Sequence, residues 1–169
     1  MKLILSDRSL ALPSLDSTTQ FIDLSQKKIK NCVGCFGCWT KTPGKCVIRD
    51  DATTIYPLIA SSNRVIYISK IKYGSYDTIM KTILERSIPV QQAFIRLHHG
   101  ESHHIQRNVV PKQAVIIGYG ASSPEEETLF RQLISRNAYN MNFEHTQVHV
   151  VPEHLLEETL KSEVSKWKN

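Results

Sequence analysis

The stretch that decides the fold class is Arg64-Val65-Ile66-Tyr67-Ile68-Ser69, followed by Lys70-Ile71-Lys72-Tyr73-Gly74-Ser75-Tyr76. The first six residues form a short run rich in β-branched side chains, which predicts a strand at the centre of a parallel sheet. The next seven form a predicted loop. Residues Asp77 to Ser87 then carry apolar side chains at helical spacing. The sequence of strand, loop and helix is one step of an α/β fold.

Further strands and helices are predicted on both sides of this step. The strands are residues 2–6, 21–24, 112–118 and 143–151, and the helices follow Asp51, Ser123 and Val151. The link from Asp7 to Gln20 is too short for a full crossover helix with two loops. We therefore expect a single α/β domain over residues 1–169. It would be a doubly wound parallel sheet of about five strands, with helices on both faces and a shortened first crossover.

Composition sets the broad class of protein. The chain has 169 residues, 41% of them hydrophobic and 22% charged, which is ordinary for a soluble globular protein. Residues 1–5 are too short a run to be a signal peptide, and no apolar run approaches membrane-spanning length. We expect a cytoplasmic protein that binds no membrane. The net charge of +5 comes without a nucleic-acid-binding motif, so no nucleic-acid partner is expected either.

All the cysteines of the chain lie in one window, with the spacing C-x2-C-x2-C-x7-C. They are Cys32, Cys35, Cys38 and Cys46. Three thiols at this spacing are typical of iron–sulfur cluster ligands, whereas structural zinc usually takes two separated pairs. Two interpretations stay open: a 4Fe-4S site, or cysteines that only resemble one and pack as small apolar groups or cycle through a disulfide.

Basic and histidine residues form two further groups. Six basic residues lie just before, among or just after the cysteines, where they could stabilise thiolates or guide in a phosphorylated dinucleotide, or simply form a solvated face: Lys27, Lys28, Lys30, Lys41, Lys45 and Arg49. Residues His98 to His104 include four of the seven histidines and a carboxylate in an irregular segment. That segment could bind a metal such as zinc or place a general acid, but we favour a polar surface loop. Asp50 and Asp51 are expected to act only as helix caps.

Several stretches resemble one family. Leu24 to Asp51, with its C-x-G-C-x-x-C run, later cysteine and Asp-Asp pair, resembles the cysteine segment of flavodoxin-like NAD(P)H-dependent FMN reductases and their iron–sulfur flavoprotein relatives. Tyr73 to Tyr76, followed by Lys81-x3-Glu85-Arg86, is similar to that family's flavin loop and its helix ending K-x3-D-R. Val115 to Gly120 is similar to the next flavin-flanking loop. Gly100 to Arg107 is similar to a G-E-x-H-H-x-x-R element of one branch. Together these matches span about residues 22–121.

The resemblance implies FMN lying over the loops after the third and fourth strands, with an aromatic ring beside it. Tyr73 and Tyr76 are the candidates for ring contact, and a purely packed role for each stays open. The implied cofactor-binding residues are Ser6, Arg8, Ser9, Ile71, Lys72, Tyr73, Gly74, Ser75, Tyr76, Gly118, Tyr119 and Gly120. The implied metal ligands are Cys32, Cys35, Cys38 and Cys46. No catalytic residue is assigned.

The chain departs from the resemblance where FMN phosphate would bind. Family members place a G-S-P-R-like loop and a helix N-terminus after the first strand. Here Ser6-Asp7-Arg8-Ser9 replaces that loop, Asp7 brings a negative charge, and the helix is largely missing. Arg8 with Ser9, or the segment 17–19, could rebuild a phosphate site. Glu125 to Glu127 already use the start of a later helix, which disfavours phosphate there.

Three function hypotheses follow. The first is an FMN-dependent oxidoreductase or electron-transfer flavoprotein, with NAD(P)H or another electron donor and a possible 4Fe-4S cluster on residues 32–46. The second is a non-catalytic flavodoxin-like subunit that has lost phosphate binding and acts through a protein partner. A third is a metal-binding protein that uses the cysteines or the histidines without flavin. A homo-oligomer, or a complex with a related flavoprotein, is expected.

Overall fold

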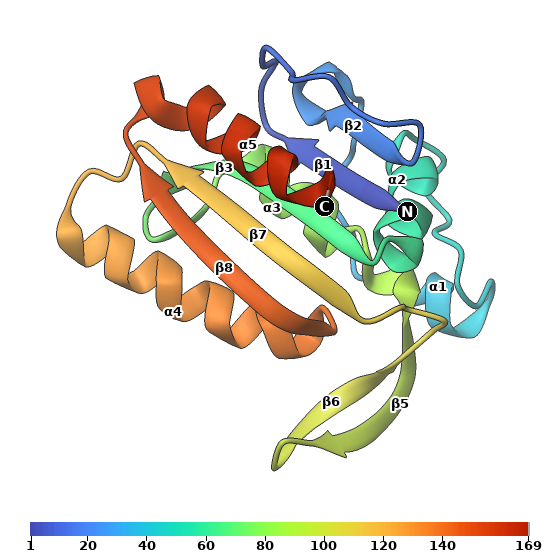
Figure 1. The fold of residues 1–169 in the computed structure, drawn as a ribbon. Helices are drawn as coiled ribbons and strands as arrows, with labels where there is room; N and C mark the ends of the chain where they lie inside the picture. Colours follow the sequence, from blue (N-terminus) through green and yellow to red (C-terminus); the bar gives the residue numbers. More distant parts are fainter. Residues whose placement is uncertain (169) are drawn as a thin grey trace.

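Five parallel strands form the centre of the protein (Figure 1). The structure, a computed structural model, describes residues 1–168. In spatial order the strands are β2 (Thr19–Asp23), β1 (Lys2–Ser6), β3 (Arg64–Lys72), β7 (Lys112–Tyr119) and β8 (Phe143–Val151). This order confirms the predicted doubly wound α/β sheet. The strand order reverses between β1 and β3, and such sheets bind ligands at that point.

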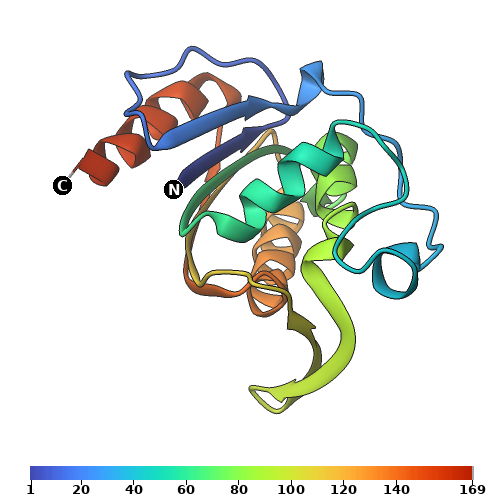
Figure 2. The same ribbon diagram turned by 90° about the vertical axis from the view of Figure 1, so that its right-hand side faces the viewer.

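Helices cover both faces of this sheet (Figure 2). On one face, α2 (Ala52–Ser61), α3 (Thr78–Glu85) and α4 (Pro124–Asn140) bury their apolar side chains in one core. On the other face, α5 (Leu156–Ser165) builds a second core. Alternate residues of β1 serve the two cores, as the period of two along a strand requires. The shorter elements are η1 (Leu24–Gln26), α1 (Gly37–Thr40), β4 (Ser75–Tyr76), η2 (Ile88–Val90), η3 (Glu153–Leu155) and η4 (Lys166–Lys168).

An extended loop takes the place of the first crossover helix. Residues 7–18 contain no helix and lie along the α5 face of the sheet (Figure 2), where Leu10 and Leu15 pack against the second core. Lys2 Nζ holds the end of the loop by an ion pair with Asp16 at 2.7 Å. The predicted shortening of this connection is confirmed.

Two hairpins were not predicted. β3 runs to Lys72 rather than Ser69 and pairs antiparallel with β4. β5 (Gln91–His98) and β6 (Glu101–Gln106) form a separate ribbon that projects from the body (Figures 1 and 2). The predicted irregular histidine loop is therefore wrong. His99 and Gly100, at φ 50° and 78°, make the tight turn that a two-residue hairpin requires. Among the described residues, no helix is both long and apolar enough to cross a membrane.

The hydroxyl of Tyr67 provides a test of the larger core. The side chain is fully buried, and its hydroxyl has no hydrogen-bond partner among residues 1–168. An unpaired buried polar group costs about 1–3 kcal/mol. We therefore expect Tyr67→Phe to raise the free energy of unfolding by about 1 kcal/mol in urea denaturation. A loss of stability would show that the hydroxyl is satisfied in solution.

Candidate functional site

The carboxyl ends of β1, β3 and β7 bring the predicted flavin loops to one edge of the sheet (Figure 1). Ser6 is paired with Ile68, and Lys70 with Tyr119. A hollow of about 400 Å³ lies between the β3–β4 turn and the segment after β7. It is lined by Lys70, Ile71, Lys72, Tyr73, Asp77, Gly120, Ser122 and Glu126. The two predicted loops thus face a common hollow, as a planar ligand held between them would require.

Tyr73 and Gly74 form the tight turn between β3 and β4. Both have positive φ, 54° and 68°, which matches the sharp reversal of the chain. Glu126 Oε1 accepts the backbone N–H of Gly74 at 3.2 Å and so fixes the turn to the start of α4. The Tyr73 side chain is 88% exposed. Its ring is therefore available to a ligand in the hollow.

Three other predicted ligand residues serve the core. Tyr76 is 5% exposed and packs edge-on against Phe130, with ring centroids 5.4 Å apart. Ile71 is also buried, and both residues contribute to the larger core. A Cβ on Gly118 would lie 2.7 Å from both Ile71 Cδ1 and Phe130 Cε1. Tyr76 therefore takes the packed role, and Gly118 allows the close approach of its neighbours.

The crowding around Gly118 gives a direct prediction. Gly118→Ala should lower the free energy of unfolding by about 1–3 kcal/mol, because the added methyl forces a packed core apart. Urea denaturation measures the change. Gln113→Ala, at an exposed position of the same strand, is the control. Equal stability of Gly118→Ala and the wild type would contradict the close packing.

The polar side chains of the loop after β1 are paired within the protein. Ser6 Oγ donates to the carbonyl of Arg8 at 2.7 Å, Arg8 pairs with Glu153, and Ser9 Oγ donates to Asp23. Asp7 is 5% exposed, and burial raises the pKa of its carboxyl group even though the Lys70 amide and Tyr119 hydroxyl donate to it. Tyr119 is accordingly a buried partner of Asp7.

This loop does not fit the phosphate site that the resemblance implies. No helix N-terminus follows β1, and a carboxylate already takes the amide of Lys70. The alternative segment, residues 17–19, cannot help. Thr19 pairs with Lys2 at the amino end of β1, on the opposite edge of the sheet, and its hydroxyl donates to Asp16. Both candidate rebuilt phosphate sites are therefore unsupported by the geometry.

The cysteines occupy a loop, residues 31–49, held against the edge of the body by the end of α3. Positive φ values at Gly34 and Phe36, 63° and 54°, turn the chain into the short helix α1. Cys32 and Cys35 are exposed, and all four cysteines are free thiols. Burial raises the pKa of the Cys38 thiol, and charge on the other three thiols raises it further.

Four free thiols of this type and spacing match the donor chemistry of an iron–sulfur cluster. Within residues 1–168, however, no group of three or more His, Cys, Asp or Glu side chains is arranged to hold a metal ion. The donor set fits a cluster in kind, and a cluster on this loop is a proposal.

A group of polar contacts, which we call the clasp, closes the base of the cysteine loop. It consists of Lys28, Lys30, Asp50, Asp51 and Arg86. Asp51 Oδ2 accepts the amide of Lys28 at 2.7 Å, and Asp50 Oδ2 accepts the amide of Lys30 at 2.9 Å. The two ends of the loop are thereby joined. The cap role predicted from sequence for Asp50 and Asp51 does not account for these contacts. Asp51 makes no side-chain cap bond at all.

Arg86 is the centre of the clasp. Its guanidinium is fully buried and donates to both carboxylate oxygens of Asp50 at 2.7 and 2.9 Å. It also donates to the carbonyls of Lys30 and Ile48 at 2.6 and 3.3 Å. Its Nη2 lies 3.5 Å from Cys46 Sγ. Burial alone would raise the pKa of Asp50, but the hydrogen bonds and charge of Arg86, together with the Lys30 and Ala52 amides, outweigh it and hold that pKa below its ordinary value.

Comparison with known proteins places this geometry in context. No family model matches the chain. An iron–sulfur flavoprotein of Methanocaldococcus jannaschii is 33% identical over 76 residues, which are 45% of this chain and 38% of that protein. One of Archaeoglobus fulgidus is 38% identical over 68 residues, which are 40% of this chain and 30% of that protein. The chain therefore spans only about a third of the length of these relatives.

Solved structures share the fold across almost the whole chain. An FMN-dependent NADH-azoreductase from Bacillus anthracis, in complex with FMN, aligns with a TM-score of 0.60 at 10% identity and covers 99% of both chains. An NAD(P)H:quinone oxidoreductase from Methanothermobacter marburgensis aligns with a TM-score of 0.58 at 10% identity, over 98% of this chain and 95% of that one. The fold is flavodoxin-like.

Part of the chain is thus similar in sequence to two iron–sulfur flavoproteins. This agrees with the resemblance inferred from the cysteine segment. Relative to that resemblance, sequence reasoning missed the role of Arg86 and the internal pairing of Asp7 and Arg8. The Asp-Asp pair and the arginine that ends α3 were visible as motifs. Their contact across 36 positions of sequence was not.

The β5–β6 ribbon lies against the cysteine loop. Trp39 Nε1 donates to the carbonyl of Gln91 at 3.0 Å, and its ring lies 4.7 Å from that of His104. His103 uses both ring nitrogens, at 2.9 Å from Asn140 Oδ1 and 3.1 Å from Glu101 Oε2. The histidines thus serve the ribbon, and none belongs to a three-ligand group within the described residues.

Proposed function

We propose that this chain is an electron-transfer flavoprotein of the iron–sulfur flavoprotein type. The sequence similarity to two iron–sulfur flavoproteins carries the proposal. It is supported by the four free thiols on the loop that the clasp closes. The flavodoxin-like fold and the hollow between the two flavin loops support the flavin part. The azoreductase structure contains FMN, and a flavin, with NAD(P)H as the electron donor, belongs to this proposal.

The chain's own residues would position the flavin ring. Tyr73 would lie beside the ring on the β3–β4 turn, and Gly120 and Ser122 would face it across the hollow. Glu126 would keep the turn in place through the Gly74 amide. When bound, a flavin accepts electrons in pairs and passes them on singly, which is the chemistry that an electron-transfer protein needs.

The cysteine loop would hold a 4Fe-4S cluster through Cys32, Cys35, Cys38 and Cys46. The clasp would fix the two ends of the loop, so that Cys46 stays beside the first three thiols. The Arg86 N–H near Cys46 Sγ would also donate to a ligating sulfur, and such hydrogen bonds tune cluster potentials.

An anaerobic purification tests the proposal. We expect flavin bands that acid precipitation releases, a broad absorbance that bleaches on reduction, and about four irons per chain. Cys35→Ala should lose the iron while keeping the flavin bands. A colourless protein that stays apo with excess FMN and with excess riboflavin would refute the flavin part, and flavin without iron would refute the cluster.

A second candidate is a non-catalytic flavodoxin-like subunit. One observation favours it: the polar side chains of the loop after β1 are already paired within the protein, Ser6 with the Arg8 carbonyl, Arg8 with Glu153 and Asp7 with the Lys70 amide. Such a subunit would bind no flavin alone and would act through a partner, possible partners being a second copy or a related flavoprotein. The purification above separates the two candidates, because only the first predicts released flavin.

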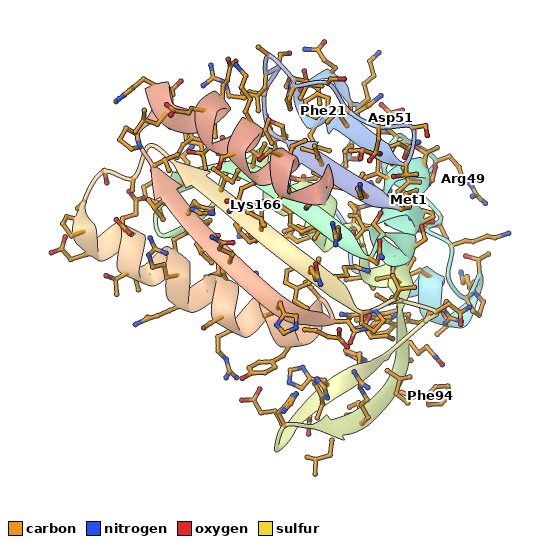
Figure 3. All side chains as sticks on the ribbon, viewed as in Figure 1. Met1, Phe21, Arg49, Asp51, Phe94 and Lys166 are labelled. Carbon is orange, nitrogen blue, oxygen red and sulfur yellow. The ribbon has the colours of Figure 1, made fainter. Side chains whose placement is uncertain are left out.

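The β5–β6 ribbon gives the proposed oligomer a candidate surface. Phe94, Ile95 and Leu97 are 69%, 65% and 76% exposed, and Phe94 points away from the body (Figure 3). Exposed apolar side chains on a projecting ribbon are typical of contact surfaces. If a second copy covers them, Phe94→Asp should shift the protein to a monomer in analytical ultracentrifugation, and Lys81→Asp should not. A monomeric wild type would refute the oligomer.

A further inference from the structure

We infer that this chain selects a flavin without a 5′-phosphate, because its own carboxylates occupy the anion-binding positions at the ligand edge of the sheet. The inference rests on the proposed function, since it concerns the same flavin site. It names the chemical class of the ligand as an uncharged flavin such as riboflavin.

Asp7 takes the first of these positions. Its Oδ2 accepts the backbone N–H of Lys70 at 2.6 Å, and its Oδ1 accepts the Tyr119 hydroxyl at 2.9 Å. Its own amide is spent on the carbonyl of Ile68 at 3.1 Å. A phosphate at the end of β1 would therefore meet a buried carboxyl group and no free amide from residue 7.

Two more anion-binding positions are occupied by Glu153 and Glu157, at the start of the last helical segment. Glu153 pairs with the guanidinium of Arg8, and Arg8 also lies over the Tyr119 ring at 5.6 Å. Glu157 Oε1 accepts the amide of Ala11 at 2.9 Å. In this loop the chain's own carboxylates thus hold an arginine and a main-chain amide, which are the groups that usually bind phosphate.

Acidic residues also occupy the helix N-termini at this edge of the sheet. Asp77 Oδ1 accepts the first amide of α3 at 2.7 Å, and Glu126 accepts the Ser122 amide at 2.7 Å beside α4. These side chains already use the positive ends of the helix dipoles. The carboxylates at this edge are Asp7, Asp77, Glu126, Glu153 and Glu157, against the cations Arg8, Lys70 and Lys72.

An uncharged flavin avoids this conflict. The ring would lie in the hollow beside Tyr73, where no phosphate contact is needed. Beside the loop after β1, a smaller hollow of about 220 Å³ includes Arg8, Glu153 and Glu157 in its lining. Hydroxyl groups of a ribityl chain can donate to carboxylates, whereas a phosphate with its negative charges is repelled by them.

The test compares two flavins on the full chain freed of bound flavin. Riboflavin and FMN are titrated separately, and binding is followed by quenching of flavin fluorescence. We expect the Kd for riboflavin to be lower than that for FMN by about tenfold or more, a difference of about 1.4 kcal/mol. FMN binding as tightly as riboflavin, or more tightly, would overturn the inference and leave the proposed function intact. If neither flavin binds, both are overturned.

Matched glutamate variants identify the cause of the selection. Glu153→Gln releases Arg8 and should tighten FMN binding about fivefold to tenfold, because a freed guanidinium can pair with phosphate. Glu158→Gln, at an exposed position on α5, should change neither Kd. An FMN affinity that Glu153→Gln leaves unchanged would show that the carboxylates do not set the preference, and would overturn the inference.

Discussion

Replacing Arg86 with methionine is expected to lower the free energy of unfolding by about 3–5 kcal/mol and to open the base of the cysteine loop. The guanidinium is fully buried and is the only partner that reaches Asp50, Lys30 and Ile48 together within the described residues. Its removal leaves a buried carboxylate without its cation and two carbonyl groups without a donor. Leaving one charge of a buried pair alone is among the most costly single changes in a protein.

Two measurements check this result. Urea denaturation gives the change in stability, and the rate at which a thiol reagent labels Cys46 reports the opening of the loop. Cys46 is half-buried and its amide donates to the Tyr56 hydroxyl at 3.2 Å, so labelling should be slow in the wild type and faster in Arg86→Met. Lys81→Met, at an exposed position of the same helix, is the control.

A double-mutant cycle separates the ion pair from the carbonyl contacts. Asp50→Asn should be costly alone but should add little to Arg86→Met, because both remove the same pair. Additive losses in the double variant, or an Arg86→Met protein as stable as the wild type, would contradict the role of the clasp.

The parallel sheet could be predicted because its signals are local. β1 and β8 have the predicted bounds, since each is a short apolar or alternating run between polar turns. β3 extends further than predicted because Ile71 is buried while Lys70 and Lys72 point outward, a strand alternation that resembles a polar loop. The two extra hairpins turn at Tyr73-Gly74 and His99-Gly100. Neither pair has the asparagine or aspartate that usually marks such turns.

The candidate site was predictable only in part. Spacing alone brought the cysteines together as one group, and the alternation of strands and helices placed the flavin loops at one edge. The contacts of Asp7 with Tyr119 and of Asp50 with Arg86 join residues 112 and 36 positions apart. Such pairs form only when the helices and strands pack together. From the sequence alone, local roles such as a helix cap or a loop residue already explain the same aspartates.

Lys112 gives the second large effect, a dependence of stability on pH. Its side chain is 1% exposed, and its ammonium donates to the carbonyls of Ala60, Ser62 and Val110 at 3.1, 3.0 and 2.9 Å. No carboxylate pairs with it among residues 1–168. Burial lowers the pKa of Lys112 from 10.5 to about 8. The buried charge therefore lowers the stability of the folded protein at neutral pH.

The sign of the effect follows from the two pKa values. Between about pH 8 and 10.5 the unfolded chain binds a proton at this site that the folded protein does not, so stability rises with pH across this window. The gain should approach about 3 kcal/mol, because each pKa unit corresponds to about 1.4 kcal/mol. Urea denaturation from pH 7 to 10.5 measures it as the difference between wild type and Lys112→Met, which cancels the titration of other groups. Lys161→Met, at an exposed position, should track the wild type. A constant difference between wild type and Lys112→Met would mean that the three carbonyl groups hold the ammonium charged throughout, with its pKa no lower than in the unfolded chain.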